Sequence, residues 1–121
     1  MGANVLKEKS FSFAIRITKL NRFLIEEKNE YVLSKQILRS GTSIGAMVRE
    51  AEFSESKSDF VHKMAIAQKE TNETIYWIDL LASVNYIDEN LKESLQTDAT
   101  ELMKIITASI KTAKNSLNIK H

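Results

Sequence analysis

Apolar residues recur every three or four positions through four long stretches of this chain, and no proline interrupts any of them. That spacing places the apolar side chains on one face of an α-helix. Proline and glycine are the residues that most often end helices and form turns, and this chain has no proline and only three glycines. The pattern therefore predicts an all-α fold.

Four helices are expected, at about residues 5–28, 31–53, 57–83 and 88–118, within a single domain over residues 1–121. The connections between them are short, and short connections make consecutive helices antiparallel neighbours. A chain of this length can bury a core of its own. We expect an up-down-up-down four-helix bundle whose two termini share one end.

Local signals mark where the helices begin, end and face the core. Asn4 is expected to cap the start of the first helix, and Ser56, with Asp59 three residues later, the start of the third. Asn85 is expected to take the left-handed conformation that ends the third helix. The core-facing stripe of the first helix is Phe13, Ile17, Leu20 and Leu24, widened by Ile15 and Phe23.

Two glycines, Gly41 and Gly45, lie one helical turn apart inside the second predicted helix. Each costs up to about 1 kcal/mol relative to alanine in a helix interior, so a compensating role is expected. Their neighbours are also small, which favours a place where another helix or a subunit comes close. A phosphate-binding glycine loop is rejected, because neither glycine precedes the Lys-Ser/Thr pair of a P-loop.

The composition is that of an ordinary soluble protein, with 43% hydrophobic and 27% charged residues. No apolar run is long enough to span a bilayer, and the N-terminal segment lacks the apolar core of a signal peptide. The absence of cysteine excludes disulfides, thiolate metal sites and cysteine nucleophiles. We expect a cytoplasmic protein with no membrane partner.

Neither a metal centre nor an active site is predicted. Di-metal bundles use two Glu-x-x-His motifs, whereas this chain offers a single Asp59-x-x-His62, and its other histidine, His121, is the last residue. Glu70 and Glu73 are spaced for acid-base work on the third helix, but nearby Lys and Arg residues favour surface ion pairs. We expect no enzymatic activity, no cofactor and no metal.

Positive charge gathers near the two ends of the chain, although the net charge is only +1. Antiparallel helices bring these two segments side by side, and a basic stripe of this kind is the usual footprint of a phosphate backbone. Lysine-rich terminal helices are also common solubilising surface, so both interpretations stay open. The candidate nucleic-acid-binding residues are Lys7, Lys9, Arg16, Lys19, Arg22, Lys104, Lys111 and Lys114.

Two segments of the sequence are distinctive. They are QILRSGTSIGAMVREA and SKSDFVHKMAIAQKETNET, the second followed after Ile75 by YWIDLL. These segments resemble a bacterial family of four-helix-bundle proteins encoded in intervening sequences of 23S ribosomal RNA genes. The resemblance covers the second and third helices closely and the rest by length and pattern. It implies a bundle that assembles into a ring-like homopentamer and has no known enzymatic activity. The chain is also distantly similar to the accessory protein of diversity-generating retroelements, a more basic pentameric barrel that binds a reverse transcriptase and nucleic acid.

The resemblance assigns the residues of the family motif to helix packing or a subunit interface. Small residues and crossed charges of this kind suit a helix that is packed on two sides. The motif positions are Arg39, Ser40, Gly41, Ser43, Gly45, Arg49, Glu50, Asp59, Phe60, Lys63, Lys69, Glu70, Glu73 and Trp77.

The resemblance and the charge pattern together predict a self-assembling, non-enzymatic bundle that binds structured RNA or an RNA-handling protein. The alternative is a structural scaffold that binds a protein and has no nucleic-acid role. Salt-dependent RNA binding would separate the two, because phosphate contacts release counterions.

Overall fold

The structure, a computed structural model, describes residues 2–119, with side chains described for residues 5–117. The described residues form four α-helices and no strand. In chain order they are α1 (Gly2–Lys28), α2 (Leu33–Glu52), α3 (Lys57–Ser83) and α4 (Glu89–Ile119). The predicted all-α architecture with four helices is confirmed. Because α1 begins at Gly2, Asn4 lies inside the helix, and the prediction that Asn4 caps it was wrong.

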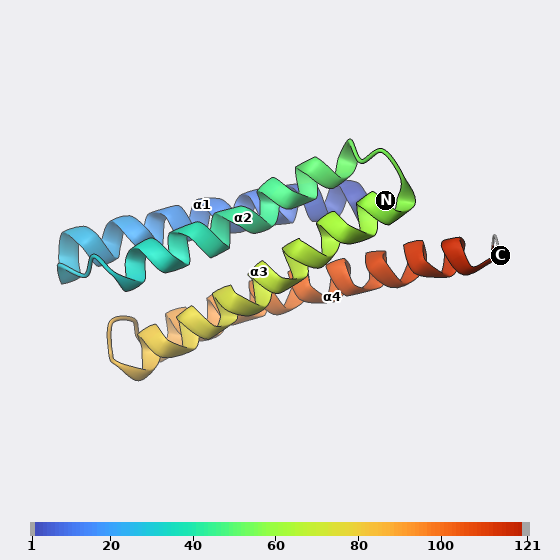
Figure 1. The fold of residues 1–121 in the computed structure, drawn as a ribbon. Helices are drawn as coiled ribbons and strands as arrows, with labels where there is room; N and C mark the ends of the chain where they lie inside the picture. The colour runs from blue at the N-terminus through green and yellow to red at the C-terminus, as the bar shows by residue number, and fades with distance from the viewer. Residues whose placement is uncertain (1, 120–121) are drawn as a thin grey trace.

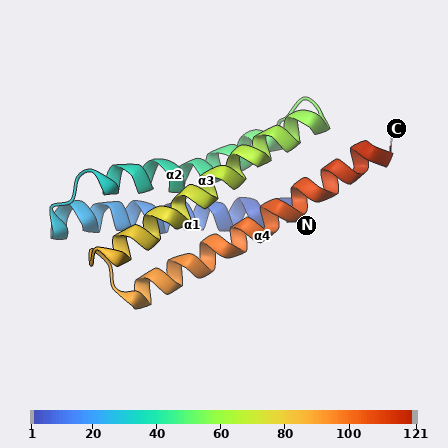
Figure 2. The same cartoon turned by 60° about the horizontal axis from the view of Figure 1, so that its bottom comes forward.

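The helices pack as two antiparallel hairpins, α1 with α2 and α3 with α4, and α2 lies against α3 (Figure 1). The remaining contact, between α1 and α4, is the least extensive of the four. Both views show the two ends of the chain and the α2–α3 connection at the same end of the bundle (Figures 1 and 2). There the last turns of α4 run past the other helices.

The core is formed by the apolar stripes of all four helices. The predicted stripe of α1 is buried along its whole length, but Ile15 and Phe23 do not widen it, because their side chains are 43% and 38% exposed. Since α1 contacts only α2 and α4, a narrower apolar face is enough. The fully buried large side chains are Leu6, Phe13, Ile17, Leu24, Ile37, Ile44, Met64, Ile78, Leu81, Leu95, Leu102 and Ile106.

A buried carboxylate, Glu30, begins α2. Its oxygens accept hydrogen bonds from the backbone N–H groups of Val32, Leu33 and Ser34 at 3.2, 3.0 and 2.7 Å. Burial alone would raise the pKa of Glu30, but these hydrogen bonds outweigh it and hold the pKa below its ordinary value. The helix therefore begins at Leu33 and not at Tyr31, where it was predicted to begin.

Two of the other predicted helix ends are confirmed. The Ser56 hydroxyl accepts a hydrogen bond from the Asp59 N–H at 3.0 Å and caps α3. Asn85 follows α3 with a φ of 66°, in the left-handed region. A further cap was not predicted, since an Asp88 carboxylate oxygen accepts from the Leu91 N–H at 2.8 Å at the start of α4.

The two α2 glycines face α1 of the same chain. A Cβ atom on Gly41 would lie 2.8 Å from two side-chain carbons of Ile17, and one on Gly45 would lie 3.4 Å from the Ser10 carbonyl oxygen. The predicted close approach of another helix is therefore found. At Gly41 this approach is possible only because glycine has no side chain.

None of the helices in the described part of the chain combines the length and the apolar character that crossing a bilayer requires.

Candidate nucleic-acid interface and assembly groove

Three of the eight predicted nucleic-acid-binding cations are already paired with carboxylates. Lys7 lies 3.4 Å from Glu52, and Lys9 lies 3.2 Å from Glu101. The third is Arg16, whose guanidinium donates to the Asp98 carboxylate at 2.7 Å and to the Ser94 hydroxyl at 2.9 Å. Each pair is about a third or more exposed, so solvent screens it and each contributes little to stability.

These pairs divide the predicted basic stripe. Glu101 and Asp98 of α4 lie opposite Lys9 and Arg16 of α1 and neutralise its middle. Of the eight predicted cations, the five that make no ion pair within the described residues fall into two groups. They are an α1 patch (Lys19 and Arg22) and an α4 patch (Lys104, Lys111 and Lys114).

The two patches lie at different heights along the bundle. Lys19 borders a crevice that it shares with Leu91 and Leu95 of α4. Leu95 and Lys104 are nine residues apart, which corresponds to about 14 Å of helix. The α4 patch therefore lies nearer to the end of the bundle that holds the chain termini.

The predicted interface residues gather mainly where α2 meets α3. Arg39 of α2 forms ion pairs with Glu70, at 3.2 Å, and with Glu73, and the indole N–H of Trp77 donates to Glu73 at 3.0 Å. The hydrogen bonds from Trp77 and Arg39 hold the pKa of Glu73 below its ordinary value. An acid-base pair would require one carboxylate with a raised pKa, so this direction gives no support to catalysis here.

Two further sets of contacts lie along the same junction, one fully buried and one partly exposed. The hydroxyls of Ser40 and Thr74 hydrogen bond to each other at 2.9 Å, and both side chains are fully buried. At the end of α2, Lys63 lies 3.9 Å from Glu50 and 3.6 Å from Asp59. The motif positions therefore hold helices of one chain together, whatever further contacts they make.

Several motif residues lie elsewhere. The Ser43 hydroxyl donates to the Arg39 carbonyl oxygen within α2 at 2.6 Å. Lys69 is exposed, Phe60 is half-buried, and Arg49 lies over the ring of Phe11 at 5.2 Å from its centroid. The contact between Phe11 and Arg49 was not predicted, because nothing local in the sequence relates α1 to Arg49.

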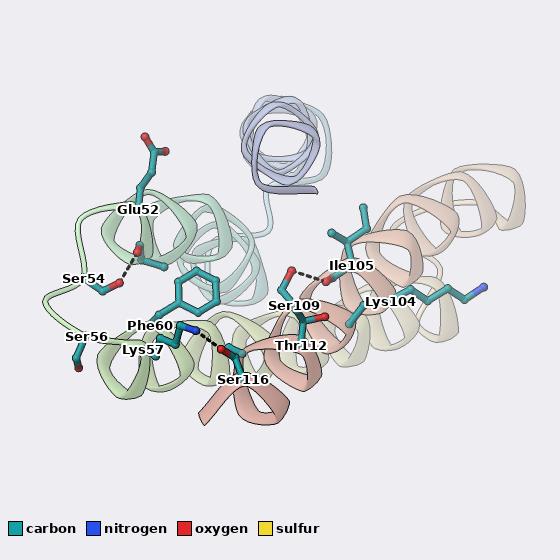
Figure 3. A pocket seen from close by; sticks show the side chains of 13 residues that line it. Glu52, Ser54, Ser56, Lys57, Phe60, Lys104, Ile105, Ser109, Thr112 and Ser116 are labelled. Atoms are coloured by element: carbon teal, nitrogen blue, oxygen red, sulfur yellow. Dashed lines mark hydrogen bonds between the residues drawn. The ribbon is translucent and has the colours of Figure 1, made fainter. Parts of the chain in front are cut away.

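An open apolar groove runs between the end of α2, the start of α3 and the C-terminal half of α4 (Figure 3). Phe60 points into it, and the Lys57 ammonium donates to the Ser116 hydroxyl across it. This groove was not predicted, although the small residues of α4 between Ala108 and Ser116 were a signal for it in the sequence. Its lining residues are Ala51, Glu52, Ser54, Ser56, Lys57, Phe60, Lys104, Ile105, Ala108, Ser109, Thr112, Ala113 and Ser116.

The described residues contain no group of three histidine, aspartate or glutamate side chains that could hold a metal ion. His62 is exposed on α3. His121 lies outside the described residues.

Comparison with known proteins identifies the family. A protein of unknown function from the S23 ribosomal protein family of Bacteroides thetaiotaomicron has a crystal structure that superposes with a TM-score of 0.91. The two sequences are 52% identical, and the match covers 92% of this chain and 99% of that one. No curated protein matches. The model of the 23S rRNA-intervening sequence protein family matches residues 3–108, and the chain belongs to this family.

Proposed function

We propose that this chain is a non-enzymatic, self-assembling module that binds structured RNA in the cytoplasm. The observation that carries the proposal is the separation of cations into paired and unpaired groups, which leaves the α1 patch and the α4 patch available to phosphates. The family to which the chain belongs takes its name from intervening sequences of 23S rRNA, and this supports RNA as the ligand.

On this proposal, the two patches act through charge rather than through base recognition. Each lysine or arginine that meets a phosphate displaces a condensed counterion, so affinity falls linearly with salt on logarithmic axes. Because the patches lie at different heights along the bundle, one RNA must extend along α1 and α4 to meet both. A folded RNA with phosphates on a broad surface fits this requirement better than a short single strand.

The direct test measures the binding of the purified protein to a labelled structured RNA by fluorescence anisotropy, across a salt series. We expect submicromolar to micromolar binding at low salt that weakens steeply as salt rises, since non-specific affinities lie in about the 10⁻⁴ to 10⁻⁶ M range at physiological salt. Absence of binding even at low salt would overturn the RNA proposal and favour the protein scaffold.

Self-assembly is the second part of the proposal, and the apolar groove supports it. In a ring each copy presents one surface to the next copy and a different surface to the previous one. The groove offers small residues along α4, which allow a helix to approach closely, and an apolar floor that no described helix covers. We propose that a neighbouring copy occupies this groove in a ring-like homopentamer.

The variant Ala108→Glu tests the assembly. Ala108 is exposed and lines the groove, so a glutamate there leaves the isolated fold intact but places a charge in the contact. Sedimentation velocity should show five chain masses for the unmodified protein and smaller species for the variant. Asn115→Glu is the matched control, because Asn115 is exposed on the same helix outside the groove. Equal sedimentation of all three proteins would contradict this use of the groove.

The same groove favours a second candidate function, a scaffold for a protein partner without a role in nucleic-acid binding. An RNA-handling protein could also occupy it while the patches hold the RNA. The salt series above separates these functions, because a scaffold alone would bind no RNA at any salt concentration.

A further inference from the structure

A small crevice lies between α1 and α2, and none of its lining residues belongs to the lining of the apolar groove or to either basic patch. It has a volume of about 270 Å³. Its walls include Lys7, Phe11 and Ala14 from α1 and Gly45, Ala46 and Arg49 from α2. None of the residues that line it is acidic.

Phe11 forms the aromatic wall of this crevice and is 54% exposed, so the core does not account for it. The guanidinium of Arg49 lies 5.2 Å from the centre of the Phe11 ring, in the geometry of a cation–π contact. Arg49 makes no ion pair with any described carboxylate, so its charge remains available. The exposed ring of Phe11 and the guanidinium of Arg49, which makes no ion pair with the described carboxylates, therefore lie side by side at the crevice.

The floor is shaped by small residues. Ala14, Gly45 and Ala46 carry little or no side chain, and Gly45 leaves its side of the crevice open beside the Ser10 carbonyl oxygen. The volume is somewhat below the roughly 300 to 1,000 Å³ of sites for drug-sized ligands. A single flat ring system fits such a space, whereas an extended stack of rings does not.

These features together select one ligand chemistry. A simple anion would use Arg49 and Lys7 but not the exposed ring, and an aliphatic ligand would use the ring but not the cations. A nucleobase with its phosphate uses both, because bases stack on aromatic side chains and on arginine while phosphates bind the same cations. Lys7 is already paired with Glu52 at 3.4 Å, so Arg49 is the cation assigned to the phosphate.

We propose that this crevice binds one unpaired nucleobase of RNA, stacked on Phe11, with the adjoining phosphate on Arg49. The inference rests on the proposed RNA-binding function and deepens it, since it names unpaired bases in loops or bulges as the recognised element. A perfect duplex keeps its bases stacked inside and cannot enter the crevice. The basic patches then supply affinity, and the crevice supplies preference for RNA with unpaired bases.

The first test compares Phe11→Leu with Phe23→Leu. Both phenylalanines are exposed on α1 with a cation near the ring, but Phe23 lies outside the crevice. We expect Phe11→Leu to weaken the binding of an RNA hairpin with an unpaired loop by about tenfold, since stacking on an aromatic side chain contributes at least that much in favourable cases. The salt slope should stay unchanged, because no phosphate contact is lost.

Two controls make this result specific. A blunt duplex of the same length should bind both variants and the unmodified protein equally. Phe23→Leu should change hairpin affinity by less than about twofold. If Phe11→Leu leaves hairpin affinity intact, or instead changes the sedimentation of the protein without changing RNA affinity, the crevice is not a base site and the inference is overturned.

The second test does not depend on polyanion binding. Millimolar adenosine or uridine 5′-monophosphate is titrated into the labelled protein, and NMR shifts are followed at the Gly45 amide and the Ala14 methyl group. We expect saturable shifts at both, absent in Phe11→Leu. Absence of these shifts overturns the inference whether or not the protein binds RNA, whereas shifts without RNA binding would overturn only the proposed function.

Discussion

The contact between α2 and α3 and the contact between α1 and α4 join the same two hairpins in opposite ways. Between α2 and α3, the hydroxyls of Ser40 and Thr74 are fully buried and hydrogen bonded to each other. Ion pairs such as Arg39–Glu70 lie at the solvent-facing edge of this contact. The α1–α4 contact is the least extensive in the bundle and carries exposed ion pairs such as Arg16–Asp98. Beyond it, the last turns of α4 lie beside the open groove.

This difference separates the surfaces that stabilise the fold from those that are free to bind. Substitutions at the buried α2–α3 contact should lower stability, because buried polar groups without partners are costly. Substitutions of the solvent-exposed charged residues of α1 and α4 should change stability little and binding more. The loss of stability should therefore be larger at the buried α2–α3 contact than at the exposed ion pairs between α1 and α4.

Thr74→Val should lower the free energy of unfolding by about 1–3 kcal/mol, because it leaves the Ser40 hydroxyl buried without its partner. Urea denaturation measures the loss. Thr74→Ser, which keeps the hydroxyl, should lose less. A double variant with Ser40→Ala should be less destabilised than the sum of the single variants, and strict additivity would contradict the pairing.

Glu30→Gln should lower the free energy of unfolding by about 0.5–2 kcal/mol, as the loss of a helix cap does. The stability of the unmodified protein should also depend on pH through this group. Since the folded-state pKa of Glu30 is lowered, its contribution is complete above the ordinary value of 4.5 and is lost as the pH falls through the folded-state pKa.

Urea denaturation at several pH values tests the direction of this effect. The stability difference between the unmodified protein and Glu30→Gln should be constant near neutral pH and should shrink below pH 4.5. A difference that grows on acidification would show that burial, rather than the backbone hydrogen bonds, dominates the environment of Glu30.

Arg16→Gln should lower the free energy of unfolding by only about 0.2–1 kcal/mol, because the Arg16 and Asp98 side chains are 34% and 42% exposed. The loss should nearly vanish at 1 M salt, where such pairs are screened. A loss as large as that of Thr74→Val would mean that the α1–α4 contact stabilises the fold as much as the α2–α3 contact does.

Much of the fold could be predicted because its signals are local in sequence. Helix-spaced apolar residues give the four helices, and the Ser56 and Asn85 positions mark helix ends through their own side chains. Glu30 was missed because its capping role depends on how the turn brings its carboxylate to the backbone N–H groups at the start of α2. Asn4 was misassigned because the helix starts before it.

The candidate sites were less predictable because they depend on pairs of residues that are distant in sequence. Arg16 and Asp98 are 82 positions apart, so nothing local showed that this cation would be paired. The crevice beside Phe11 likewise needs Arg49 from another helix, and the groove needs α2, α3 and α4 together. The sequence shows where the charged residues are, but it does not show which of them form ion pairs with one another.

The most direct test of the account asks whether unpaired cations, rather than all cations, bind RNA. The double variant Lys111→Gln with Lys114→Gln removes unpaired charges outside the groove, and Lys9→Gln with Arg16→Gln removes the same number of paired charges. Anisotropy with a structured RNA across a salt series should show the salt slope reduced by about 1 to 2 in the first variant and nearly unchanged in the second. Equal reduction in both, or no reduction in the first, would contradict the account.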